Sequence, residues 1–252
     1  MASFGASNRE LLVHMNGGKG ESSYANNSLL QKKLMLKANH ILEETIMRLY
    51  CDSSPNCMKV ADLGCSVGPN TLLDPSLGSM EVAPLNKGHC HIVSTSPPEV
   101  YKAYLKQYQQ DFKLFLKSRS DELAPGGAMV LVLLGNHETP RRTVYEPTVE
   151  EIKHVIEEEG SFFIQQLEIL ILPWDEGISE GGEDSSLDGN IKAELMAKHV
   201  RAAMEPLMST KFGAEVITEV FRRYQKKVVQ LMEVEKENLE CATFMISMTK
   251  RA

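Results

Sequence analysis

The chain has 252 residues, of which 42% are hydrophobic, and its formal charge is −7. This length and composition suffice for one large α/β core, whereas the acidic charge argues against nucleic acid as a partner. No apolar run approaches the roughly 20 residues that cross a bilayer, and no secretory signal is visible, so no membrane association is expected. The five cysteines are scattered and lack metal-ligand spacing, which predicts reduced thiols in a cytoplasmic protein.

Hydrophobic periodicity in the first half of the chain predicts alternating helices and strands. A helix is expected over residues 28–50, followed by a short strand over 58–63 that is buried on both faces. A long amphipathic helix is expected over 98–123, because apolar side chains recur there every three or four positions. The following Pro-Gly-Gly turn leads into an apolar strand over 128–134.

The second half continues this alternation. Thr148 and Glu151 form a capping-box pattern that starts a helix, and Gly160 ends it. Residues 175–189 contain six acidic side chains and few apolar ones, so we expect a surface loop there, with an interaction segment as the alternative. No internal repeat is present, and a single domain over residues 1–252 is expected. The remaining predicted elements are strands over 162–172 and 241–248 and helices over 191–207 and 214–237.

The most informative stretch is residues 60–70, VADLGCSVGPN, which begins inside the predicted strand. Its small residues would allow a ligand to lie against the backbone at the carboxyl end of a strand, where open α/β sheets bind their ligands. The spacing differs from the dinucleotide pattern G-x-G-x-x-G, and the Lys and Ser/Thr of a phosphate-binding P-loop are missing. The turn is similar to that of S-adenosylmethionine (SAM) enzymes, with an ordinary strand and turn as the alternative.

A wider resemblance supports the SAM interpretation. Residues 14–28, HMNGGKGESSYANNS, followed by Gln31 and by DLGCSVGPNT at 62–71, resemble the opening of the plant SABATH family of SAM-dependent carboxyl methyltransferases. The resemblance implies an α/β fold with a Rossmann-like SAM-methyltransferase sheet and a helical cap. It also implies SAM as cofactor and a small carboxylic acid of the salicylate, benzoate or jasmonate type as substrate. Similar segments follow in the same order at 86–88, 94–98, 112–116, 125–130 and 204–207.

The same resemblance implies that residues 10–32 form a lid. Tyr24 and Ser28 are implied to contact SAM, and the structural alternatives are a surface aromatic ring and a helix N-cap, respectively. Asn16 is assigned a SAM contact as well, although relatives often carry a different polar or basic residue there. Gln31 is implied to contact the substrate carboxylate, with an ordinary exposed helical glutamine as the alternative.

The SAM-binding turn is expected over residues 58–71. Asp62 is implied to orient SAM, although an Asp at a strand end can also cap the next turn. Cys65 is implied to line the pocket but could equally be a small packing residue. Asn86 matches a position associated with Mg²⁺ in some relatives; its companion ligands are not found in this sequence, so a metal site is the weaker expectation. The other residues implied to line the SAM pocket are Gly64 and Asn70.

The implied reaction requires little of the protein's side chains. A carboxylic acid of pKa about 4 is already an anion at neutral pH, so no general base and no catalytic side chain are expected. Catalysis then consists of desolvating and aligning the reactants, which can contribute roughly 7 to 11 kcal/mol. The scattered histidines are expected to be solvated or core residues: His40, His89, His91, His137, His154 and His199.

Two internal gaps distinguish the chain from the family. After Thr71 the sequence passes directly to a stretch, 76–84, that resembles the segment following the central strands, and a second gap in the cap falls near 136–145. In the family the first strand lies between the second and the fourth, so the gaps would remove its partners on both sides. Each buried amide left unpaired costs about 1 to 3 kcal/mol, which a domain of marginal stability cannot absorb many times.

The gaps leave several outcomes open. The chain could repack, pair with another copy as a homodimer, or lack residues that the full molecule contains. The principal functional hypothesis is a SAM-dependent carboxyl methyltransferase. The alternatives are a catalytically impaired relative that binds a nucleoside or a partner subunit, and a relative that methylates a xanthine nitrogen.

Overall fold

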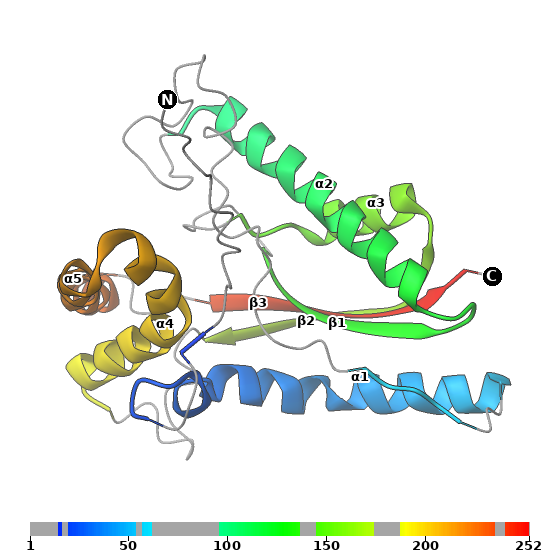
Figure 1. Ribbon diagram of the computed structural model, residues 1–252, viewed down its shortest axis with the longest axis horizontal. Helices are drawn as coiled ribbons and strands as arrows, with labels where there is room; N and C mark the ends of the chain where they lie inside the picture. Colours follow the sequence, from blue (N-terminus) through cyan, green and yellow to red (C-terminus); the bar gives the residue numbers. More distant parts are fainter. Residues whose placement is uncertain are drawn as a thin grey trace, which may run out of the picture. The chain divides into compact units, whose positions relative to one another are not determined.

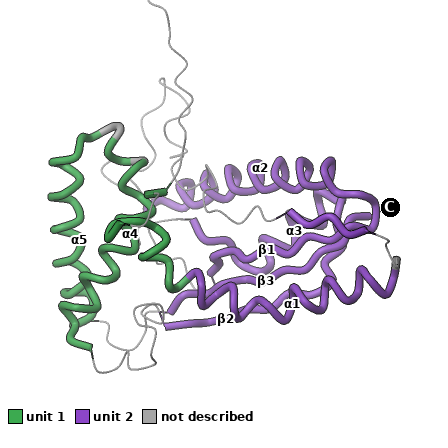
Figure 2. The backbone as a smooth tube through the Cα atoms, turned by 60° about the horizontal axis from the view of Figure 1, so that its bottom comes forward, with its two compact units in different colours: residues 1–30, 177–237 green, residues 31–176, 238–252 purple. Residues whose placement is uncertain are grey.

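The computed structural model describes residues 15–16, 20–53, 57–61, 96–136, 145–173, 187–234 and 240–251 (Figure 1). The chain divides into two compact units (Figure 2). The first comprises Met1–Leu30 and Gly177–Glu237, and the second comprises Gln31–Glu176 and Asn238–Ala252. Across the described ranges, no helix is both long and apolar enough to span a bilayer.

The second unit contains a three-stranded antiparallel sheet in the order β1-β3-β2. Its strands are β1 (Ala128–Gly135), β2 (Phe162–Pro173) and β3 (Glu240–Lys250). The three predicted strands at these positions are therefore confirmed. The last strand of the sequence lies in the middle of the sheet and hydrogen-bonds to both others, which is why it is almost completely buried.

Helices cover both faces of this sheet (Figure 1). On one face, α2 (Pro98–Glu122) and α3 (Val149–Glu159) pack against alternate residues of β3 in a core that includes Phe244 and Ile246. On the other face, α1 (Leu29–Ser53) packs against Met245. The unit is thus an α/β arrangement with helices on both sides of the sheet, as the sequence predicts.

Local sequence signals explain where α3 begins and ends. The Thr148 hydroxyl accepts a hydrogen bond from the Glu151 backbone amide at 3.2 Å, and the Glu151 carboxylate accepts one from the Thr148 amide at 2.9 Å. Gly160 has the left-handed conformation, with φ of 83°, that favours glycine after the last helical turn. The predicted capping box and glycine stop are both confirmed.

The first unit is helical. Its described residues form a 3-10 turn, η1 (Tyr24–Asn26), and two long helices, α4 (Gly189–Phe212) and α5 (Ala214–Val234), separated by Gly213. The described parts of the two predicted helices are confirmed, although α4 extends beyond the predicted residue 207. The side chains that α5 buries recur at helical spacing: Ile217, Phe221 and Val228.

One predicted strand is wrong over its described part. Residues 58–61 have no regular secondary structure, and the Val60 side chain is 75% exposed. The physical reason is that a strand buried on both faces needs hydrogen-bonding neighbours, and the segments expected to provide them are missing from the sequence. The remainder of this prediction, at Asp62 and Leu63, and most of the acidic loop, 175–186, lie outside the described residues.

Candidate functional site

The described part of the predicted lid is a compact turn built by its own polar side chains. The Ser23 hydroxyl accepts a hydrogen bond from the Asn26 amide at 3.4 Å, and Ser23 itself is buried. The Asn26 side chain donates to the Gly20 carbonyl at 3.0 Å. The Asn27 side chain donates to the carbonyls of Glu21, at 2.8 Å, and Ser23, at 2.7 Å. The conformation of this turn is therefore fixed locally by its Ser and Asn residues.

Backbone hydrogen bonds attach the turn to α4. The Tyr24 amide donates to the Asn16 carbonyl at 2.8 Å, and the Asn16 amide donates to the Ala202 carbonyl at 3.0 Å. The Asn16 side chain donates in addition to the Glu205 carboxylate at 3.0 Å. Asn16 thus joins the segment carrying Tyr24 to the middle of α4, and these residues all belong to the first unit.

An ion pair on α4 holds the acceptor for Asn16 in place. Arg201 donates twice to Glu205, at 2.7 and 3.1 Å, and its guanidinium lies 5.8 Å from the centre of the Phe221 ring. The hydrogen bond from Arg201, with a smaller contribution from Asn16, lowers the pKa of the Glu205 carboxyl. Glu205 is therefore a charged acceptor at neutral pH, and hydrogen bonds to charged groups are stronger than neutral ones.

His199 provides a second attachment point. Its Nδ1 lies 2.6 Å from the Asn27 carbonyl oxygen, which can only accept, so Nδ1 carries the proton. Burial lowers the pKa of this imidazole, although the bond to Asn27 opposes the shift. The expectation that the histidines are solvated or core residues is confirmed for His199, which has a structural contact with the lid.

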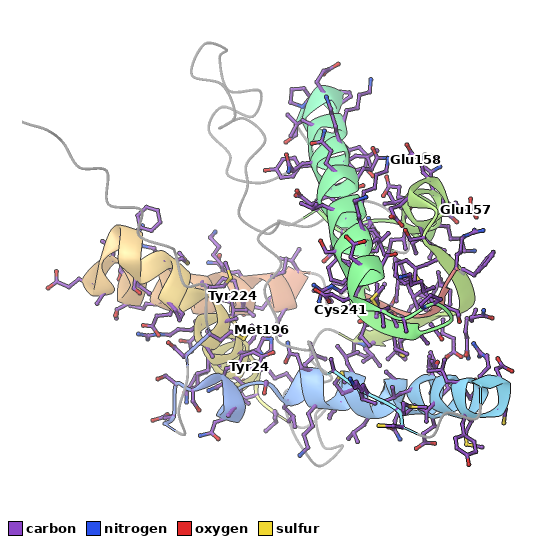
Figure 3. The ribbon with its side chains drawn as sticks, turned by 45° about the vertical axis from the view of Figure 1, so that its right-hand side comes forward. Tyr24, Glu157, Glu158, Met196, Tyr224 and Cys241 are labelled. Carbon is purple, nitrogen blue, oxygen red and sulfur yellow. The ribbon has the colours of Figure 1, made fainter. Side chains whose placement is uncertain are left out.

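Two described SAM-contact candidates, Tyr24 and Ser28, lie just before the amino-terminal end of α1. Tyr24 (Figure 3) is half-buried in η1, and burial raises the pKa of its phenol, which therefore remains a protonated hydrogen-bond donor at neutral pH. Ser28 immediately precedes α1, at the position of an N-cap residue. Gln31 lies in the first turn of that helix and belongs to the second unit.

The other predicted site residues lie outside the described residues. Within the described ranges, no group of three or more His, Cys, Asp or Glu side chains could hold a metal ion. The roles assigned to the SAM-binding turn and to the magnesium position therefore remain predictions. The residues concerned are Asp62, Gly64, Cys65, Asn70 and Asn86.

The lid contacts on α4 were missed by sequence reasoning. Arg201, Glu205 and His199 hold the lid, yet their only signal was the family-like segment at 204–207. A second missed cluster lies in the other unit, where the Glu151 carboxylate accepts hydrogen bonds from two tyrosine hydroxyls. These are Tyr101, at 2.8 Å, and Tyr145, at 2.7 Å.

Comparisons with known proteins bear on both the fold and the site. The family described as SAM dependent carboxyl methyltransferase matches residues 10–77, 73–143 and 141–251 of this chain. The junctions between the three blocks fall close to the two gaps predicted from the sequence. Residues of both units therefore lie within one family match. The single domain expected over residues 1–252 stays a prediction.

Curated relatives align over most of their own length. The chain is 29% identical to the S-adenosyl-L-methionine:benzoic acid/salicylic acid carboxyl methyltransferase 1 of Petunia hybrida, over 95% of this chain and 98% of the relative. It is 26% identical to a probable jasmonic acid carboxyl methyltransferase 2 of Theobroma cacao, with the same coverage of both chains. The petunia alignment runs over 363 positions, 111 more than the 252 residues of this chain, so large internal gaps are required.

A solved structure supports the fold. A loganic acid methyltransferase with SAH superposes with a TM-score of 0.75 at 18% sequence identity, covering 95% of this chain and 99% of that one. At this identity the similarity establishes the fold alone. The predicted α/β SAM-methyltransferase fold is confirmed.

Proposed function

This chain belongs to the family of SAM-dependent carboxyl methyltransferases, and we propose that it transfers the methyl group of SAM to the carboxylate of a small organic acid, producing a methyl ester. Members of this family are enzymes, and SAM is their cofactor. The observation that carries the proposal is the family match from residue 10 to residue 251, which includes the lid. The described part of the predicted lid, which bonds to α4 through Asn16, Asn27 and Glu21, supports it.

The described residues fit a nucleoside cofactor at the lid. The Tyr24 ring is half-buried and its hydroxyl is a donor, so it can stack on and hydrogen-bond to a ligand beside it. Asn16 already donates one side-chain hydrogen bond to Glu205, so its main role in this proposal is to hold Tyr24 in position. The contacts of Ser28, Asp62, Gly64, Cys65 and Asn70 with SAM are proposed from the family resemblance.

The mechanism then requires alignment rather than proton transfer. SAM supplies an electrophilic methyl group on a sulfonium. With SAM bound, an oxygen of the substrate carboxylate would bond to the methyl carbon while the carbon–sulfur bond broke and its electron pair remained on sulfur. No proton moves, so no side chain need act as a base. The chain contributes by excluding water at the lid and by orienting the carboxylate, for which the Gln31 amide is the proposed donor.

The proposed substrate class is a small acid such as benzoate, salicylate or jasmonate. This choice is supported by the relatives named for benzoic, salicylic and jasmonic acids at 26% to 29% identity. Methylation of a xanthine nitrogen is the alternative within the same fold. In that reaction the nucleophile would be a neutral ring nitrogen instead of a carboxylate anion. Assays with both carboxylic acids and xanthines therefore distinguish the two reactions.

A second candidate function is a catalytically impaired member that binds a nucleoside or a partner subunit. One argument for it is that the alignment with the petunia relative has 111 more positions than this chain has residues. The other is that residues 58–61, where the family carries its first strand, are irregular in this structure. This candidate predicts that SAM binds without methyl transfer, or that neither occurs.

The proposal is tested by incubating the purified full chain with methyl-labelled SAM and each of benzoate, salicylate, jasmonate and xanthine. Label in a methyl ester that alkali hydrolyses supports carboxyl transfer. Label in an N-methyl xanthine, or no transfer to any acceptor by folded protein, contradicts it.

A matched pair of tyrosine variants tests the lid in the same assay. Tyr24→Phe should raise the KM for SAM by about two- to tenfold, the value of one hydrogen bond. Tyr50→Phe alters an exposed tyrosine at the other end of α1 and should leave KM unchanged. Equal KM values in the two variants would argue against a SAM contact by the Tyr24 hydroxyl.

A further inference from the structure

The helix α4 contains a proline in its interior. It runs from Gly189 to Phe212, and Pro206 lies inside it. A proline has no backbone N–H, so it cannot make the hydrogen bond that a helical residue donates to the carbonyl four positions earlier. For Pro206, that carbonyl belongs to Ala202. The proline therefore leaves the Ala202 carbonyl oxygen without its usual helical donor.

The Ala202 carbonyl has a partner from outside the helix. Ala202 is fully buried, so its carbonyl requires a hydrogen-bond donor within the protein. The Asn16 amide is such a donor, and 3.0 Å separates its nitrogen from the Ala202 oxygen. The acceptor of this long-range hydrogen bond is thus the group that Pro206 leaves without its helical donor.

The residue before the proline supplies a second acceptor for Asn16. The Glu205 carboxylate accepts a hydrogen bond from the Asn16 side chain at 3.0 Å. The Asn16 carbonyl in turn accepts one from the Tyr24 amide at 2.8 Å. Two consecutive residues of α4 therefore determine both acceptors on the helix: Glu205 provides one directly, and Pro206 makes the other available.

A proline inside a helix can also serve only to bend it. A bend by itself does not require that the released carbonyl bond to any particular segment. In α4 this carbonyl is buried and bonded to a residue near the other end of the chain. Asn16 and α4 both belong to the first unit, so the contact lies within one compact body.

We propose that Pro206 is a positioning residue: its missing N–H creates the acceptor that fixes Asn16, and through it the turn carrying Tyr24, on α4. The two donors of Asn16, its backbone amide and its side-chain amide, match the two acceptors on the helix. With any other residue at position 206, a helical N–H would compete for the Ala202 carbonyl. The helix would gain a hydrogen bond, and the attachment of Asn16 would weaken.

Residue-resolved hydrogen exchange of the full chain, in the wild type and in Pro206→Ala, tests this role. The alanine N–H should compete with the Asn16 amide for the Ala202 carbonyl. The amides of Asn16 and Tyr24 should then exchange about two- to tenfold faster, as expected for one weakened hydrogen bond. The amides of α4 next to position 206 should exchange more slowly, because the helix gains a hydrogen bond. These opposite changes separate positioning from a general loss of stability.

A matched replacement isolates the missing N–H. Lactic acid at position 206 has the same methyl side chain as alanine but forms an ester, which also lacks an N–H. The chain that carries it should therefore keep wild-type exchange at Asn16 and Tyr24. Fast exchange with lactic acid as well as with alanine would attribute the effect to the loss of the proline ring, and it would overturn the proposal.

The control for helix stability is Gly189→Ala, which raises the helix propensity of α4 at its first residue and leaves position 206 unchanged. It should not alter exchange at Asn16 or Tyr24. Wild-type exchange at both residues in Pro206→Ala, or an equal effect of Gly189→Ala, would contradict the positioning role. None of these measurements depends on methyl transfer.

Discussion

The Glu205 carboxylate on α4 is one of the groups that bond to the predicted lid segment. It accepts hydrogen bonds from both Arg201 on its own helix and Asn16 beside the lid. The acceptor lies 189 positions from Asn16 in the sequence, so no local pattern could have revealed the contact. The family resemblance predicts a lid over residues 10–32, and that role stays a prediction; the contact of its described part with α4 was not predicted.

Replacing this carboxylate should loosen the lid. Glu205→Ala leaves Asn16 without its charged acceptor, which is worth about 1.5 to 3 kcal/mol. The Tyr24 amide, which bonds to the Asn16 carbonyl, should then exchange with solvent at least about tenfold faster. The control is Glu219→Ala, because that exposed side chain forms ion pairs with Arg222 and Arg223 on α5. Unchanged exchange at Tyr24 in Glu205→Ala would contradict the anchoring role.

His199 gives the first unit a pH-dependent stability. Burial holds the pKa of its imidazole below the ordinary 6.5, so the unfolded chain takes up a proton first as the pH falls. The free energy of unfolding should therefore fall as pH decreases below 6.5, until the folded-state pKa is passed. His199→Asn keeps a donor for Asn27 but does not titrate, and it should show a shallower decrease in urea titrations between pH 5 and about 7.

The same titrations of the wild-type chain provide the reference slope. A His199→Asn slope identical to that of the wild type would show that this imidazole does not couple folding to pH.

At the level of elements, a cluster of hydrogen bonds to one carboxylate fixes the amino-terminal end of α3. Glu151 accepts hydrogen bonds from the Thr148 amide, the Tyr101 hydroxyl and the Tyr145 hydroxyl. Glu151→Ala should lower the free energy of unfolding by about 2 to 3 kcal/mol, since it removes a cap and two charge-assisted bonds. Glu150→Ala, at the exposed neighbouring position, should cost less than about 0.5 kcal/mol in the same urea titration. Equal losses would refute this account of the helix start.

Elements with local signals were predicted closely. The capping box and Gly160 fix α3, and the proline turn and apolar runs locate α2 and β1, because these signals act over a few residues. The strand expected over 58–63 lacked such determinants: its stability depends on neighbouring strands, and residues 58–61 are irregular. The 3-10 turn at Tyr24 was also not predicted, because single turns have no periodicity to detect.

At the scale of the whole molecule, the chain matches the family over most of its length but has large internal gaps relative to its relatives. The match extends from residue 10 to residue 251, yet an alignment with a petunia relative requires 111 positions more than this chain has. The described strands all come from the second half of the sequence, after residue 127. The proposed activity therefore depends on whether the lid and the turn at 58–71 still bind SAM in the shortened chain.

The most direct test is a calorimetric titration of the folded full chain with SAM and, separately, with its demethylated product. Both ligands should bind saturably, and their binding should be weakened by Tyr24→Ala and unchanged by Tyr50→Ala. If folded wild-type protein takes up neither ligand, the proposed methyl-transfer function is wrong.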